Sequence, residues 1–189
     1  MNEKQLFKST WTRWALILGV ASLAFNVILG FLGLYGNRTV GLLGLVISVV
    51  IIVAAFAAYK NANGGYLRFG RGVGMSALIG LLGGLIAGVL LLIYMIGIDP
   101  SLMDQMQDAQ VEQAIEAMEK RDMPVDEDQL REQMDSSFVR NMTYGGILLG
   151  GPIFSCIWCV IVGLVAGAIM KNNPPPEHGH PVAEMGEGE

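Results

Sequence analysis

Charged residues are scarce in this sequence. Of its 189 residues, only 15% are Asp, Glu, Lys or Arg, whereas a typical soluble domain contains about 25%. Hydrophobic residues make up 52% of the chain, and the mean hydropathy is +0.49. This composition argues against an ordinary soluble domain and indicates a membrane protein. The chain is long enough for one domain.

The sequence also lacks the patterns that usually carry chemistry. Its two histidines, His178 and His180, lie in the C-terminal tail, so no Ser-His-Asp triad is available, and a metal site needs three or four fixed ligands. No Gly-Lys pair of a P-loop, no calcium-loop motif and no basic stripe for nucleic acid is present. We therefore expect a protein that is not an enzyme, with no cofactor, no metal and no nucleic-acid partner.

Long apolar runs are what the sequence does contain. Four of them, at 14–35, 40–59, 73–98 and 144–170, hold no Asp, Glu, Lys or Arg. A bilayer core of about 30 Å is crossed by roughly 20 helical residues. Lipid offers the backbone N–H and C=O groups no hydrogen-bond partners, so each run must form a helix that satisfies them internally. The first run is too long for a signal peptide. We expect an all-α membrane protein, a bundle of four transmembrane helices with an acidic helical insert between the third and fourth.

The distribution of Lys and Arg predicts the orientation of these spans. Seven basic residues fall on one side of the predicted membrane: Lys4, Lys8, Arg13, Lys60, Arg68, Arg71 and Lys171. Positive charge near span ends favours the cytoplasm. Residues 1–13 and 171–189 are therefore expected in the cytoplasm, and the Pro- and Gly-rich tail is expected to be disordered.

The connection 99–143 is the acidic insert, predicted to lie outside the cytoplasm. It holds twelve acidic and four basic residues, a net charge of −8. Asp99 followed by Pro100 is typical of a helix start, and Asp126 with Gln129 predicts a second helix that carries Phe138. We interpret the acidic surface as a solvated helical face, and the alternative is a docking surface or a surface that attracts cations.

Small residues recur at every fourth position in the third and fourth spans. The third span carries Gly72, Ser76, Gly80, Gly84 and Gly88, and the fourth carries Gly151, Ser155, Cys159, Gly163 and Gly167. Such stripes let helices approach closely, so we expect these two spans to pack on each other. Leu91 is expected to be exposed.

The stretch 63–84 raises the alternative of a phosphate-binding loop. Gly70, Gly72 and Gly74 resemble a dinucleotide fingerprint, but the third spacing fails and a predicted membrane helix precedes them in place of a strand. An interfacial turn fits better, in which Arg68 and Arg71 reach phosphates of the membrane lipids.

Two further polar features lie inside the spans. Asn26 is expected to make a helix–helix hydrogen bond, although a substrate contact is an alternative. Cys156 and Cys159 have the Cys-x-x-Cys spacing of redox proteins. Because both should lie near the bilayer middle, we favour packing over redox chemistry.

The segments "YKNANGGYLRFGRGVGMSALIG", "IDPSLMDQ" and "IEAMEKRDMPVDEDQLREQM" resemble an uncharacterised family of small four-span inner-membrane proteins from Bacteroidota. The likeness covers roughly residues 10–172, supports the topology and brings no catalytic residues. We expect a non-enzymatic accessory or structural subunit that acts by helix packing and contact with a membrane-protein partner or with other copies of itself. The alternatives are a small oligomeric transporter or channel and a membrane thiol oxidoreductase that uses Cys156 and Cys159.

Overall fold

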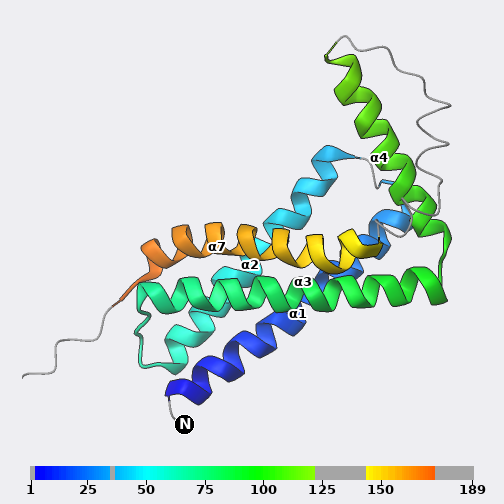
Figure 1. Ribbon diagram of the computed structural model, residues 1–189. Helices are drawn as coiled ribbons and strands as arrows, with labels where there is room; N and C mark the ends of the chain where they lie inside the picture. The colour runs from blue at the N-terminus through cyan, green and yellow to red at the C-terminus, as the bar shows by residue number, and fades with distance from the viewer. Residues whose placement is uncertain (1–2, 35–36, 122–143, 173–189) are drawn as a thin grey trace, which may run out of the picture.

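The structure is a computed structural model and describes residues 3–34, 37–121 and 144–172. The described residues form helices in chain order, with no strand among them: α1 (Glu3–Phe31), α2 (Arg38–Ala62), α3 (Phe69–Gly97), α4 (Ser101–Glu119), the π-helical turn η1 (Gly146–Gly150) and α7 (Gly151–Met170). Figure 1 shows these helices and their order.

Four of the helical segments are long and apolar enough to cross a membrane: α1, α2, α3 and η1 joined to α7. The predicted all-α architecture with four spans is therefore confirmed. Helix α1 begins at Glu3, well before the apolar run at 14, because nothing between the two positions interrupts the helix and its first turns carry the basic side chains.

Helix α3 occupies the centre of the bundle. It packs against α1 on one side and against α7 on the other, and α3 and α7 run antiparallel to each other (Figure 1). Helix α2 crosses behind α7 at a large angle and contacts mainly α1 and α7. A helix with neighbours on two sides must be apolar all round, as α3 is.

The main core lies where α2 crosses the other helices. Ile52, Phe56, Tyr59, Met75 and Ile79 are all fully buried there. Lipid gives no hydrophobic drive for helices to associate, so the close packing of these large side chains holds the crossing at the C-terminal half of α2.

A smaller core forms at the opposite end of α3. Leu91 and Met95 of α3 pack there with Leu102 and Met103 of α4. Leu91 is only 7% exposed, so the prediction that it is exposed was wrong. The physical reason is that α4 begins soon after α3 ends and turns its apolar side onto this position.

The first helix of the predicted insert is present as α4, which points away from the four spans (Figure 1). The helix begins one residue later than predicted, with Pro100 at its N-cap. The Asp99 carboxylate accepts hydrogen bonds from the Ser101 amide at 3.1 Å and from its hydroxyl at 2.5 Å. The second predicted helix, with Asp126, Gln129 and Phe138, lies outside the described residues. So do the histidines and almost all of the predicted tail.

Candidate functional site

The small residues of α3 and α7 face each other. A Cβ atom added to Gly80 would lie 2.7 Å from both Cys159 Cβ and the Ser155 carbonyl oxygen, and one added to Gly84 would lie 2.9 Å from Ser155 Cβ. Because real Cβ atoms do not approach other atoms so closely, the two helices touch backbone to backbone at these positions.

The same contact line continues in both directions. A Cβ atom on Gly163 would overlap the Ser76 side chain, Gly72 lies next to Gly167, and a Cβ atom on Gly88 would lie 2.8 Å from the Ile147 carbonyl oxygen. The structure thus brings nine of the ten predicted stripe residues to one helix–helix contact.

Gly151 departs from this pattern. It is exposed, and a Cβ atom added there would meet nothing within 4 Å. Its place against α3 is taken by Pro152, whose Cα would lie 2.8 Å from a Cβ on Gly84. The turn η1 ends just before Gly151, and beyond Pro152 the contact with α3 continues at Ile147 of this turn, whose carbonyl oxygen faces Gly88.

A second close contact, between α1 and α3, was not predicted from the sequence. A Cβ atom on Gly19 would lie 2.6 Å from the Ile86 side chain, and one on Gly83 would lie 3.1 Å from the Ala15 carbonyl oxygen. The Gly83-Gly84 pair was the available signal. Adjacent residues of an α-helix lie about 100° apart around its axis, so Gly83 faces α1 and Gly84 faces α7.

The two cysteines lie inside this packed region and are both free thiols. Cys159 is fully buried against α3, while Cys156 is half-buried. A buried thiol has no path to a partner disulfide or thiol, and exchange requires direct attack by a thiolate. The arrangement suits a packing role for Cys159 better than a redox role.

A cavity of about 420 Å³ lies between the spans, beside the contact of α3 and α7. All four membrane-crossing segments line it, and its polar lining residues are Ser22, Asn26 and Ser155. The Asn26 amide donates a hydrogen bond of 2.7 Å to the Ser22 carbonyl oxygen within its own helix. Small residues from all four spans, Gly41, Gly44, Ala87 and Gly88 among them, line much of the rest.

A polar link between two spans occurs away from Asn26. The Trp158 indole N–H of α7 donates a hydrogen bond of 2.8 Å to the Ser48 hydroxyl of α2, and this hydroxyl donates in turn to the Leu45 carbonyl oxygen at 2.6 Å. This link joins α2 to α7 within the spans, where few other polar groups are available.

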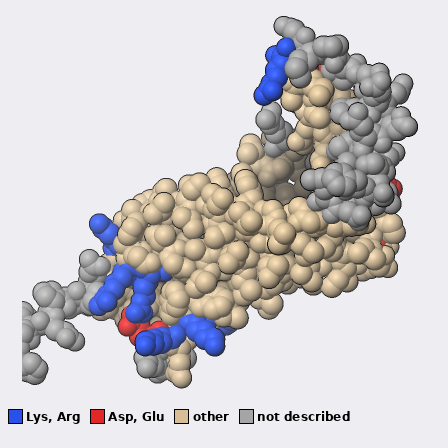
Figure 2. Space-filling model, in the orientation of Figure 1, with Lys and Arg blue, Asp and Glu red and all other residues tan. Residues whose placement is uncertain are grey.

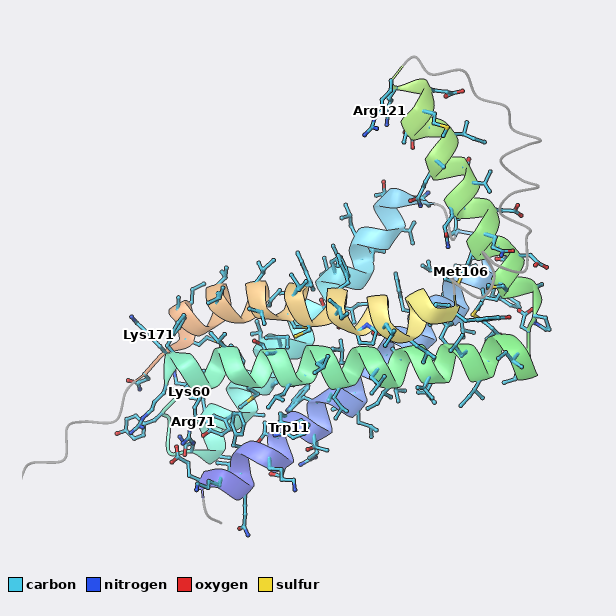
Figure 3. The ribbon with its side chains drawn as sticks, in the orientation of Figure 1. Trp11, Lys60, Arg71, Met106, Arg121 and Lys171 are labelled. Carbon is cyan, nitrogen blue, oxygen red and sulfur yellow. The ribbon has the colours of Figure 1, made fainter. Side chains whose placement is uncertain are left out.

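Basic side chains gather at one end of the bundle, where α1 and α3 begin and α2 and α7 end (Figure 2). Figure 3 shows Lys60, Arg71 and Lys171 at this end and Arg121 at the distant tip of α4. The Lys60 ammonium donates to the Met170 carbonyl oxygen at 3.3 Å, and so satisfies one of the free carbonyl groups at the end of α7.

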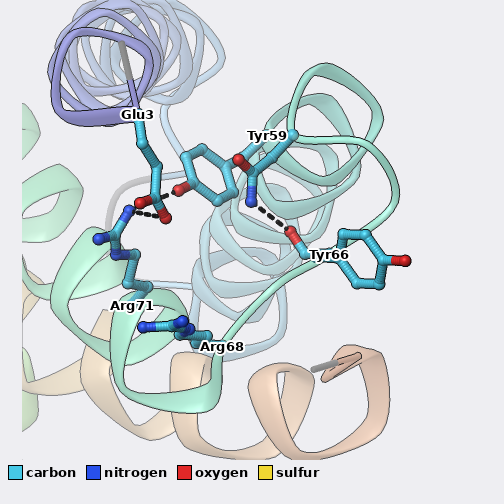
Figure 4. Close-up of a pocket in the computed structure, with 6 residues that line it drawn as sticks. Glu3, Tyr59, Tyr66, Arg68 and Arg71 are labelled. Atoms are coloured by element: carbon cyan, nitrogen blue, oxygen red, sulfur yellow. Dashed lines mark hydrogen bonds and ion pairs between the residues drawn. The ribbon is translucent and has the colours of Figure 1, made fainter. Parts of the chain in front are cut away.

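A polar pocket of about 220 Å³ opens at this basic end (Figure 4). Its lining residues are Glu3, Tyr59, Asn63, Tyr66, Arg68 and Arg71. The Arg71 guanidinium forms an ion pair with the Glu3 carboxylate and donates a hydrogen bond of 3.0 Å to the Tyr59 hydroxyl. The predicted reach of Arg71 to lipid is therefore limited by partners within the chain, whereas Arg68 is exposed.

The loop that carries Tyr66 and Arg68 is tied to the end of α7. Leu67 and Asn172 exchange two backbone hydrogen bonds, of 2.9 and 3.0 Å, and the Leu67 side chain is fully buried. Within the loop, Gly64 and Gly65 have φ angles of +65° and +87°, which favour glycine. The loop is thus a fixed part of the basic end.

The three glycines that resemble a dinucleotide fingerprint lie inside a helix. Gly70, Gly72 and Gly74 lie within the first turns of α3, so they form no strand-to-helix turn of the dinucleotide-binding kind. Sequence reasoning missed Glu3, Tyr59 and Asn63 as pocket residues, and no local pattern links Glu3 with a partner 68 positions further along the chain.

The fold and the span lengths indicate a multi-pass helical membrane protein with a further helix, α4, between its third and fourth spans. Residues 13–172 match the model of the family described as "Protein of unknown function (DUF4199)", and the chain belongs to this family. Comparisons with curated proteins and with solved structures found no match.

Proposed function

We propose that this protein is a non-enzymatic multi-pass protein of the bacterial inner membrane that acts through helix packing and partner contact, as an accessory or structural subunit. The resemblance noted above suggests an origin in Bacteroidota. The basic end of the bundle supports a cytoplasmic location for both termini, since Lys and Arg near span ends favour that side. Helix α4 and the rest of the acidic insert would then face the opposite side.

The observation that carries the proposal is the incomplete contact of α2 with the other spans. From Ile51 onward α2 has several buried residues, whereas Ser48 is the only buried one among the residues from Thr39 to Val50, whose side chains the structure describes. Leu42, Leu43 and Val46 are more than half exposed. The cavity between the spans lies beside this half of α2, and its glycine lining would let a further helix approach closely.

The partner that fits this opening is a transmembrane helix of another protein or of a second copy. Lipid alone gives no hydrophobic drive for helix association, so small residues and shape decide where helices meet. The exposed start of α2 and the cavity beside it, which glycines line, supply small residues and a complementary shape at one place.

The test is to fill the cavity without disturbing the chain itself. Gly41 lines the cavity, and a Cβ atom there would meet nothing within 4 Å. We expect Gly41→Leu to reduce the assembled fraction in mild detergent, measured by light scattering and by the recovery of co-purified membrane proteins. The matched control is Gly74→Leu, an equally open glycine outside the cavity. A wild-type protein that is monomeric and free of co-purified proteins would contradict the proposal.

One observation favours the transporter alternative as a second candidate. Ser22, Asn26 and Ser155 place polar atoms in the same cavity, as a small polar solute would require. Uptake of such solutes into liposomes that contain the purified protein, abolished by Gly41→Leu, would favour transport over assembly alone.

A further inference from the structure

The pocket at the basic end contains an unequal set of charges. Two guanidinium groups, those of Arg68 and Arg71, and one carboxylate, that of Glu3, line it. Arg71 is engaged by Glu3 and Tyr59, whereas Arg68 has no ion pair with any described residue. Figure 4 shows Arg68 next to Arg71. Two neighbouring cations with one anion leave a net positive charge at the pocket.

We propose that this pocket binds a phosphate group, held jointly by Arg68 and Arg71, which comes either from the headgroup of an anionic phospholipid or from a soluble phosphate. Arginine suits this role because its planar N–H donors match the oxygen atoms of phosphate in pairs. The pocket volume of about 220 Å³ is several times the roughly 30 Å³ that one water molecule occupies in the liquid.

The position of the pocket along the spans also fits a phosphate at the membrane surface. It lies where α2 ends and α3 begins, at the end of the spans where the Lys and Arg side chains gather. Tyr66 lines the pocket itself. Aromatic rings of this kind mark the level of lipid headgroups, and nearby cations attract anionic lipids.

The pocket is held in shape before any ligand arrives. The Asn63 side chain donates to the Tyr66 carbonyl oxygen at 2.9 Å, and Leu67 is paired with Asn172. On the opposite wall, the fully buried Tyr59 ring meets the Phe7 ring edge-on at a centroid distance of 6.2 Å. Preorganised donors lose little conformational freedom on binding.

Glu3 then acts as an internal competitor for the phosphate. Its carboxylate accepts from the same Arg71 guanidinium that a phosphate oxygen would use, and it adds a negative charge that repels the ligand. Its side chain is 46% exposed, so it can move aside. Removal of this charge should therefore strengthen phosphate binding, although it breaks an ion pair of the free protein.

The experiment measures lipid retention and thermal stability of the purified full-length chain in detergent. One arm compares phosphatidylglycerol with phosphatidylcholine by native mass spectrometry, and the other adds inorganic phosphate, with chloride at equal ionic strength. We expect Arg68→Gln to lower the affinity for the preferred anion roughly fivefold, the effect of about one basic residue near an anionic surface. Glu3→Gln should raise that affinity by a similar factor.

The control is Arg13→Gln, which removes the same charge from an exposed position on α1 outside the pocket. A preference for phosphatidylglycerol that Arg68→Gln alone abolishes identifies the lipid headgroup as the source. A rise in melting temperature with inorganic phosphate, lost in Arg68→Gln, identifies a soluble phosphate. Equal effects of the Arg68 and Arg13 variants, or weaker binding in Glu3→Gln, would overturn the proposal.

Discussion

At the scale of single residues, the same glycine-to-alanine change should have opposite effects at two positions of α3. A Cβ atom on Gly80 would lie 2.7 Å from the Ser155 carbonyl oxygen, which is backbone and cannot rotate away. We expect Gly80→Ala to lower stability by about 1–3 kcal/mol through overpacking, observed as a lower melting temperature in detergent.

Gly74 supplies the matched control for this prediction. A Cβ atom there would meet nothing within 4 Å, and alanine is favoured over glycine inside a helix by roughly 0.5–1 kcal/mol. Gly74→Ala should therefore leave the melting temperature unchanged or raise it. If both variants melt like the wild type, the close contact of α3 and α7 does not contribute to stability in the way inferred here.

At the scale of the helices, the link between α2 and α7 is open to a double-mutant test. Trp158→Phe removes the indole N–H that donates to Ser48 and keeps an aromatic ring. Ser48→Ala removes the acceptor. Interhelical hydrogen bonds in membranes contribute about 0.6 kcal/mol on average, so each variant should lose about that amount.

The double variant should then lose little more than either single one, because the bond can be broken only once. The measurement is the free energy of unfolding in detergent of the wild type, the two single variants and the double variant. Together these four values give the interaction energy between Trp158 and Ser48. Fully additive losses would show that the two side chains stabilise the bundle separately.

The existence of the helices followed from the sequence more readily than their arrangement. Lipid forces every apolar run into a helix, and a four-residue repeat of small residues marks a contact face, as Gly80 and Gly84 show. The crossing of α2 gave no such signal because most of its buried positions there, such as Ile52, Phe56 and Tyr59, are large and form no repeat of small residues. Leu91 was assigned to the wrong environment because its burial depends on where α4 turns.

The candidate pocket was harder to predict for a related reason. Arg68 and Arg71 were visible as basic residues before a span, but their surroundings come from three separate helices and a loop. The Glu3–Arg71 ion pair joins positions far apart in the chain, and the pairing of Leu67 with Asn172 closes an even longer loop. Local patterns carry no information on either contact.

At the scale of the whole molecule, the charge distribution predicts which side each end faces. The basic end carries Lys60, Arg71 and Lys171 (Figure 3), whereas α4 at the other end belongs to a connection with a net charge of −8. Moving the basic end across the membrane would oppose the positive-inside tendency. The prediction is that Ala62, at the end of α2, faces the cytoplasm and Glu112, on α4, faces outward.

Single cysteines at these two exposed positions test the orientation. A membrane-impermeant maleimide added to intact spheroplasts should label Glu112→Cys and leave Ala62→Cys unlabelled, while lysis should make both reactive. The native cysteines lie within α7, and Cys159 is fully buried, so the unsubstituted protein serves as the background. Labelling of Ala62→Cys before lysis, with Glu112→Cys protected, would reverse the orientation and place the phosphate-binding pocket on the outer face of the membrane.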